Sequence, residues 1–339
     1  MIRKVASIFK DQKSLGLSRD KIIERYNKYG IYIILLALVT ISAIIQPVFL
    51  SRINIINVMS QIAVTTIVAC GITMLIISTL TDLSAGSVVA LTGCICVGTY
   101  LSLTKMGLSL AFSGALSVLL AVIVGILVNL ISGLIITTYN APPFIVTLAM
   151  MMAARGVVFI YTDGSPIYNV GKITIIGQGK VGDLIPYSVC VTIIIVMITW
   201  VILNQTRFGR YLYAIGGNIE AAIASGIDVK RTMLLAFLIH GAFVGIAGVI
   251  FMTRIASGQP AEAVGLEFDS IIAAIIGGTS FAGGIGTIGG TIAGCIMIGV
   301  INNILNLMFV QVYWQHVIKG MIIMLAVVLD IVTKGGAKR

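Results

Sequence analysis

The chain has 339 residues, of which 58% are hydrophobic and only 10% are charged, and its mean hydropathy is +1.10. Soluble domains carry about 25% charged residues, so this composition excludes a soluble globular protein and predicts an integral membrane protein. The formal net charge of +10 does not indicate nucleic-acid binding, because eight of the 22 Lys and Arg lie within residues 1–28, in the flank of the first apolar run.

Apolar runs long enough to span a membrane recur along the whole chain. A spanning helix needs about 20 mostly apolar residues. The ten candidate runs are residues 29–49, 57–80, 84–103, 108–137, 144–161, 186–203, 232–253, 268–281, 286–308 and 315–333. The eighth run is the weakest, because it is short and contains Gly277 and Gly278, which is compatible with a broken helix. We expect an all-α polytopic membrane protein with about ten transmembrane helices.

The distribution of basic residues predicts which side of the membrane each segment faces. With the N-terminus placed inside, the inside segments hold eight basic residues before position 29, four in 204–231 and three in the C-terminal tail. The outside loops hold five, namely Arg52, Lys105, Lys172, Lys180 and Arg254. Both termini are therefore predicted to be cytoplasmic.

This orientation divides the chain into three expected parts. They are a cytoplasmic basic N-terminus at 1–28, a membrane domain at 29–333 with a cytoplasmic loop at 204–231, and a cytoplasmic tail at 334–339. The largest outside segment, 162–185, is predicted to hold a short amphipathic element on the outer surface.

Two short segments hint at an inverted internal repeat. "TDLSAGSVVALTG" begins the third run at its inner end, and "EFDSIIAAIIGGTS" begins the eighth at its outer end, with Asp82 and Asp269 ahead of helices rich in small residues. In "GTIGGTIAG", Gly286, Gly290 and Gly294 are four residues apart, a spacing that lets helices approach closely in lipid.

No group of residues predicts a catalytic or metal site. The five cysteines lie within apolar runs and predict small buried side chains rather than ligands. His240 and His316 have no third ligand in register and are expected to pack between helices or lie at an interface. No segment fits the phosphate-binding pattern Gly-x4-Gly-Lys-Ser/Thr, so any ATP must be bound by another chain.

Charged residues within the spans are few. Arg155 and Lys319 are expected to pair with an acid such as Glu267 or Asp269, or to reach the surface, rather than to contact a solute. The acids themselves lie near the ends of predicted spans, which argues against an ion-coupled carrier with deep carboxylates; they are Asp82, Glu267, Asp269 and Asp330.

The polar segment 204–231 contains signals for a short helix. Asn218 is a candidate N-cap, Glu220 falls in the first turn, and Gly226 is a typical C-terminal signal for a helix over 219–225. A helix of about seven residues is too short to be stable alone, so it should persist only when docked on something. An ordinary cytoplasmic loop is the alternative interpretation.

Within this segment, "EAAIASG" fits the Glu-Ala-Ala-x3-Gly core of the cytoplasmic loop in permeases of binding-protein-dependent ABC importers, although "IDVKRTM" replaces the usual Ile-x-Leu-Pro continuation. From about residue 30 to 333 the chain resembles the ribose/galactose/xylose permease family, most closely the ribose type. The stretches that carry this resemblance are "TDLSAGSVVALTG", "PPFIVTLAMMMAARG", "YTDGSPI", "TRFGRYLYAIGGN", "IIGGTSFAGGIGTIGGT", "NNILNL" and "YWQHVIKG".

The resemblance implies a bacterial inner-membrane permease for a monosaccharide, paired with a second copy of itself. Two ATPase domains, in two chains or one tandem chain, would dock from the cytoplasm and hold the ATP and Mg²⁺, so no cofactor is expected in this chain. A periplasmic or lipid-anchored sugar-binding protein would dock outside. Contact with the ATPase is expected at the short helix, through Asn218, Glu220, Ala221, Ala222 and Gly226.

A sugar path should be lined by small or uncharged polar groups, because the receptor supplies affinity and the pore must release the sugar. The path candidates are Asp82, Ser84, Ser87, Asn140, Thr147, Asn302 and Asn303, each of which is also suited to an ordinary interhelical hydrogen bond. Candidates for docking the binding protein are Lys172, Lys180 and Arg254.

The substrate and the class both have alternatives. Galactose, xylose, inositol, a furanose signal and a nucleoside remain open as solutes beside ribose. An ion-coupled secondary carrier is the alternative from another class of transporter.

Overall fold

The computed structural model describes residues 19–335, and the ends of the predicted N-terminal segment (1–18) and tail (336–339) lie outside these residues. All ten predicted spans coincide with helices. The helices from α2 to α8 are α2 (Arg19–Ile45), α3 (Arg52–Ile77), α4 (Ala85–Lys105), α5 (Leu110–Tyr139), α6 (Pro143–Tyr161), α7 (Ile175–Gln178) and α8 (Tyr187–Gln205). They are followed by α9 (Arg207–Gly217), α10 (Ile219–Ala224), α11 (Val229–Arg254), α12 (Leu266–Ile276), α13 (Ile288–Leu307) and α14 (Val312–Gly335).

The remaining regular structure is short. It comprises the 3-10 helices η2 (Pro47–Leu50) and η3 (Gly171–Thr174) and the antiparallel strands β1 (Lys180–Val181) and β2 (Ile185–Pro186). Together with α7, the last three elements form the outer-surface structure expected in residues 162–185. α2 begins ten residues before the predicted start of the first span at 29, so the polar flank and the span form one helix.

Seven of the described helices, α3, α4, α5, α6, α8, α11 and α13, are long and apolar enough to cross a membrane. A further apolar helical stretch, Ile31–Ile45, lies within α2. The all-α polytopic architecture is therefore confirmed. The eighth predicted span is α12, which has 11 residues and begins after Gly265 (φ +84°). It ends at the Gly277–Gly278 pair (Gly278 φ +91°), so the expected broken helix is present.

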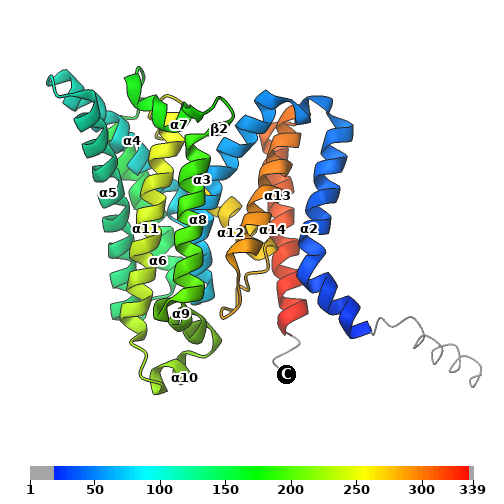
Figure 1. The fold of residues 1–339 in the computed structure, drawn as a ribbon. Coiled ribbons are helices and arrows are strands. Elements are labelled where there is room, and N and C mark those ends of the chain that lie inside the picture. Colours follow the sequence, from blue (N-terminus) through cyan, green and yellow to red (C-terminus); the bar gives the residue numbers. More distant parts are fainter. Residues whose placement is uncertain (1–18, 336–339) are drawn as a thin grey trace, which may run out of the picture.

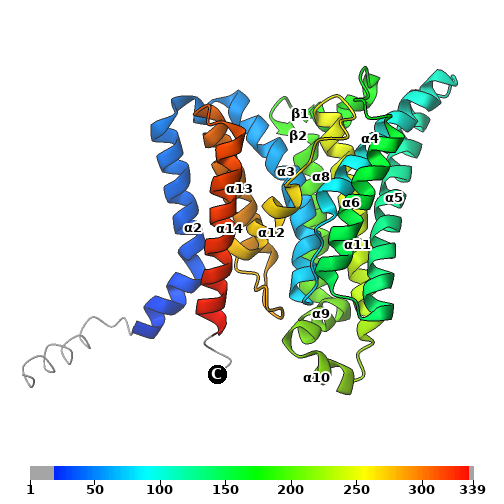
Figure 2. The same ribbon diagram turned by 180° about the vertical axis from the view of Figure 1, so that it is seen from behind.

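Figures 1 and 2 show two groups of helices, with the short α12 between them. One group contains α3, α4, α5, α6, α8 and α11, and the other contains α2, α13 and α14. α3 connects them, because it packs against α8 and α11 on one side and against α12 and α13 on the other. Its most apolar segment is 89% buried, whereas those of α5, α6 and α8 are only 17–33% buried and present apolar side chains outward.

Small residues set the closest helix contacts, as expected where packing rather than water exclusion holds helices together. A Cβ on Gly290 would overlap the carbonyl oxygen of Gly277, and a Cβ on Gly294 would overlap that of Ala273. The prediction that this glycine series brings helices together is therefore confirmed for α13 against α12.

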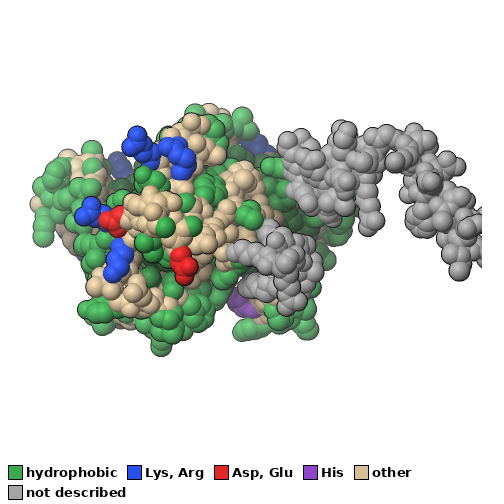
Figure 3. Space-filling model, turned by 90° about the horizontal axis from the view of Figure 1, so that it is seen from below, with side chains coloured by type: hydrophobic (Ala, Val, Ile, Leu, Met, Phe, Trp, Pro, Cys, Tyr) green, Lys and Arg blue, Asp and Glu red, His purple; other side chains and the backbone are tan. Residues whose placement is uncertain are grey.

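The two ends of the molecule differ. α9, α10, the first residues of α2 and the last of α14 lie at one end, here called the inner end, while α7 and the β1–β2 hairpin lie at the opposite, outer end (Figure 1). Seen from the inner end, Lys and Arg side chains gather over the described surface within an apolar rim (Figure 3). Both described termini and the 204–231 segment thus share one end, as the basic-residue pattern predicted.

Candidate functional site

The short helix predicted in the polar segment is α10. The Asn218 side chain accepts a hydrogen bond from the Ala221 backbone N–H at 3.0 Å, and the chain leaves the helix through Gly226 at φ +80°. Asp228 then caps the start of α11 by accepting from the Arg231 N–H at 3.1 Å. The capping signals read from the sequence therefore operate as predicted.

One of the residues expected to contact the ATPase, Ala222, is not on the exposed face of α10. Ala222 is only 3% exposed and faces the protein rather than a partner. The side chains that face outward are instead Ile219 and Ile223. They are 42% and 59% exposed and lie four residues apart on one side of the helix. Two exposed isoleucines on a six-residue helix outside the membrane spans form an apolar surface suited to a protein partner.

A second helix, α9, which was not anticipated in the polar segment, fixes α10 to the membrane helices. Gly216 lies so close to the end of α3 that a Cβ there would overlap the carbonyl oxygen of Ile77. That oxygen also accepts a hydrogen bond from the Gly284 N–H at 2.8 Å. The Tyr213 hydroxyl donates to the carbonyl oxygen of Gly286 at 2.8 Å. α9, the end of α3 and the α12–α13 connection therefore meet at one point, here called the α9 junction.

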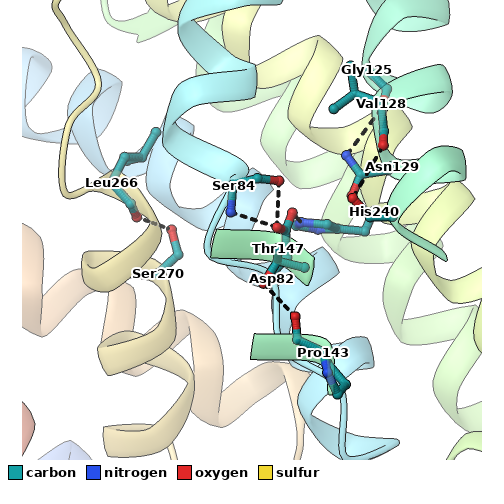
Figure 4. A network of polar contacts seen from close by, with 11 residues as sticks. Asp82, Ser84, Gly125, Val128, Asn129, Pro143, Thr147, His240, Leu266 and Ser270 are labelled. Atoms are coloured by element: carbon teal, nitrogen blue, oxygen red, sulfur yellow. Dashed lines mark hydrogen bonds and ion pairs between the residues drawn. The ribbon is translucent and has the colours of Figure 1, made fainter. Parts of the chain in front are cut away.

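A buried acid–histidine pair lies inside the helix group that contains α3, α4, α5, α6, α8 and α11. Asp82 Oδ2 is 2.9 Å from His240 Nε2, and Asp82 Oδ1 accepts from the N–H and the hydroxyl of Ser84 at 2.7 and 2.6 Å (Figure 4). Asp82 and His240 are both fully buried. A close approach of Gly71 to the imidazole makes room for this pair, because a Cβ at that position would overlap His240 Nδ1.

The described acids lie at the starts of helices, as predicted, but they are buried inside the protein. Asp82 meets the twelfth residue of the 26-residue α11, and Glu267 is only 4% exposed. A position at the end of a helix therefore does not expose these carboxylates. α4 and α12 begin inside the protein, and Gly86 of α4 faces Glu267 and Ala263. The side chain of Asp330 lies outside the described part of the chain.

A second charged cluster joins α12, α13 and α14. Lys319 Nζ lies 2.9 Å from Asp269 Oδ2, which also accepts from Asn302 Nδ2 at 3.1 Å. The predicted pairing of Lys319 with an acid is confirmed. Arg155 instead donates through Nη1 to the backbone carbonyls of Pro260 and Glu262, at 2.6 and 2.9 Å, and so holds the connection that precedes α12.

The structure separates the path candidates into three kinds. Ser84, Ser87 and Thr147 are almost fully buried among helices. Asn302 and Asn303 are also buried; Asn303 exchanges two side-chain hydrogen bonds with Asn54, at 2.8 and 2.9 Å. Asn140 is exposed in the left-handed conformation (φ 52°) after α5, where it forms the turn into α6. Its position is a helix terminus rather than a buried membrane site.

The three candidates for docking a binding protein lie at the outer end. Lys172 of η3 and Lys180 of β1 are exposed, whereas Arg254 at the end of α11 is partly buried. Among the side chains that the structure describes, no three of His, Cys, Asp or Glu come together as a metal site requires.

Comparison with known proteins relates this architecture to a family. The model of the family described as branched-chain amino acid transport system / permease component matches residues 54–327. The ribose import permease protein of Bacillus subtilis is 40% identical over 306 residues, covering 89% of this chain and 92% of the relative. The ribose import permease protein of Escherichia coli K12 is 36% identical and covers 88% and 92%.

A permease named for a different solute has a similar sequence identity to this chain. The galactose/methyl galactoside import permease protein of Escherichia coli K12 is 37% identical over 327 residues, covering 93% of this chain and 97% of the relative. No solved structure matches the chain. The apolar helices, the family model and these relatives agree, and the chain belongs to this family of membrane permease components of transport systems.

Proposed function

We propose that the chain is the membrane-spanning permease subunit of an ATP-binding cassette importer for a monosaccharide, with ribose as the first candidate. The observation that carries this proposal is α10, a short capped helix at the inner end with Ile219 and Ile223 exposed. Such an apolar surface outside the membrane suits contact with a soluble motor subunit. The names of the relatives, ribose and galactose import permeases, support the solute class.

In this proposal the ATPase moves the permease through the α9 junction. A partner that grips α10 displaces α9, because the two helices are joined by the single residue Asn218. α9 is in backbone contact with Ile77 at the end of α3 and with Gly284 in the α12–α13 connection. Since α3 packs against helices of both groups, a shift at its inner end changes how the groups lie against each other.

The complete importer requires further chains. We propose a second copy of this permease, cytoplasmic ATPase domains that hold ATP and Mg²⁺, and a sugar-binding protein at the outer end, with the assembly in the bacterial inner membrane. Lys172 and Lys180 are exposed at the outer end and suited to acidic groups on the binding protein. This chain is the conduit and carries no catalytic residue in the proposal.

An ion-coupled carrier is the second candidate, and the buried carboxylates of Asp82 and Asp269 are the observation in its favour. Each carboxylate, however, already has a partner in the chain, His240 for Asp82 and Lys319 for Asp269. Solutes other than ribose, including galactose, xylose, inositol, a furanose and a nucleoside, remain alternatives within the importer proposal.

Reconstitution distinguishes the two classes of transporter. The chain is placed in proteoliposomes with its ATPase and binding protein, and uptake of radiolabelled D-ribose, D-galactose and D-xylose is measured with and without ATP. The importer proposal expects uptake that requires ATP and the binding protein. Uptake by the chain alone, driven by a Na⁺ or H⁺ gradient without ATPase, would establish the carrier instead.

A further inference from the structure

A small polar cavity opens near the outer end of the molecule, apart from α10 and from the Asp82–His240 pair. Its volume is about 160 Å³, far above the ~10–15 Å³ that holds one water. The walls come from α3, the end of α11, and the segment that leads into α12. Its principal side chains are Gln61, Thr65, Phe251, Arg254, Glu262 and Asp269.

Asp269 lines this cavity and is held by two donors from neighbouring helices. Its Oδ2 atom takes both donors of the cluster, Lys319 Nζ at 2.9 Å and Asn302 Nδ2 at 3.1 Å. Its Oδ1 atom is buried and has no hydrogen-bond partner among the described residues, and the residue is only 7% exposed. A carboxylate at a cavity wall accepts strong hydrogen bonds from hydroxyl groups, so Asp269 suits a ligand that supplies one.

The charges of the cavity favour a neutral ligand over an ion. Arg254 and Glu262 both line the wall, and neither has an ion-pair partner in the described part of the chain. With Asp269 balanced by Lys319, the site has no excess of either sign. A cation would be attracted by Glu262 and repelled by Arg254, and a carboxylate the reverse, so the lining offers neither ion a net attraction.

The uncharged lining completes the match to a polyhydroxy compound. Gln61 and Thr65 can each donate and accept hydrogen bonds. The Phe251 ring and the apolar side chains of Val64 and Leu266 provide surface for the C–H groups of the same molecule. Donors, acceptors and apolar surface within one small cavity are the combination that a sugar requires.

We propose that this cavity is a subsite for a neutral, hydroxyl-rich solute of monosaccharide size, occupied as the solute enters from the outer end. This inference deepens the proposed function and rests on it for the solute class. Asn302, a path candidate from the sequence, then acts as a positioning residue, because it bonds Asp269 Oδ2 and helps to hold this carboxylate at the cavity wall.

The first test uses transport by the reconstituted importer. Gln61→Leu removes an amide that lines the cavity and replaces it with a side chain of similar size. Asn57→Leu, one turn earlier on α3 and outside the cavity, is the matched control. We expect Gln61→Leu to lower D-ribose uptake about three- to tenfold, the value of a lost hydrogen bond. Uptake equal to that of Asn57→Leu would overturn the subsite.

The second test needs no partner chain, so its result is independent of whether the importer proposal holds. Val264 lines the cavity and is 67% exposed, so Val264→Cys should react with a membrane-impermeant thiol reagent in the purified, detergent-solubilised chain. Leu184→Cys, 57% exposed on the hairpin and outside the cavity, is the control, and the parent chain with its five native cysteines is the blank.

Labelling of the two variants is compared with and without D-ribose, D-galactose or D-xylose. At least one sugar should slow the labelling of Val264→Cys several-fold and leave Leu184→Cys unaffected. No protection by any of the three sugars, or protection by NaCl or KCl instead, would overturn the proposal. If wild-type uptake fails while a sugar protects Val264→Cys, the importer function is wrong and the subsite stands.

Discussion

Two adjacent glycines in α9 provide a matched pair for testing the α9 junction. A Cβ at Gly216 would lie 3.0 Å from the carbonyl carbon of Ile77 and closer still to its oxygen, which is the acceptor for the Gly284 N–H. A Cβ at Gly217 would meet no atom within 4 Å. Both residues are in the last turn of the same helix, so Gly216→Ala and Gly217→Ala change helix propensity to a similar degree.

The expected difference between the variants follows from the contact. Forcing a methyl group against backbone costs about 1–3 kcal/mol, and loss of the Gly284–Ile77 hydrogen bond costs a further ~0.5–1.5 kcal/mol. Replacing Gly by Ala in a helix returns about 0.5–1 kcal/mol in both variants. Gly216→Ala should therefore destabilise the protein by about 2 kcal/mol on balance, while Gly217→Ala should be neutral or slightly stabilising.

Two measurements check this expectation. Thermal unfolding in detergent should give a lower Tm for Gly216→Ala than for Gly217→Ala, and the reconstituted importer should take up less sugar per ATP hydrolysed, because α9 no longer moves with α3. Equal Tm values and equal coupling ratios for the two variants would refute the assignment of Gly216 as the contact between α9 and α3.

Three further substitutions test other contacts. Lys319→Met leaves the carboxylate of Asp269, 11% exposed, without its cation and should lower the free energy of unfolding by about 2–4 kcal/mol. Adding Asp269→Leu should restore much of this loss. A double variant as unstable as the single variant would count against the ion pair. His240→Ala removes the partner of Asp82 Oδ2 and opens a cavity, so it should cost about 3–5 kcal/mol, whereas an unchanged Tm would show that the pair is not formed. Ile223→Asp changes an exposed side chain, so Tm should stay the same while sugar-stimulated ATPase activity falls; full activity would remove Ile223 from the coupling surface.

Local sequence signals predicted the local structure well. Asn218 and Gly226 marked the limits of α10 because caps act over a few residues of chain and need no tertiary information. Gly277 and Gly278 likewise indicated that the eighth run could be a broken helix, and α12 ends at this pair. The positions of the helices in all ten apolar runs followed from the lengths of those runs.

The long-range contacts could not be read from the sequence in the same way. Asp82 and His240 are 158 residues apart, and nothing near either residue indicates the other. α9 was missed because its polar and apolar residues suit a surface loop as well as a helix that packs on the membrane domain. The pairing of Lys319 with an acid was predicted correctly, with Glu267 and Asp269 both open as partners, because few acids lie in the membrane domain and an unpaired charge there is costly.

The identity of what binds α10 tests the account most directly. A photoreactive benzophenone side chain is placed at Ile223, which is 59% exposed at the inner end, and at Ile160 of α6 as a control, which is 81% exposed on a membrane-spanning helix. After illumination of intact cells, the cross-linked protein is identified by mass spectrometry. We predict that position 223, and not position 160, captures a cytoplasmic ATPase that carries the Gly-x4-Gly-Lys-Ser/Thr motif. Capture of no ATPase at position 223 by a chain that still imports sugar would contradict the account.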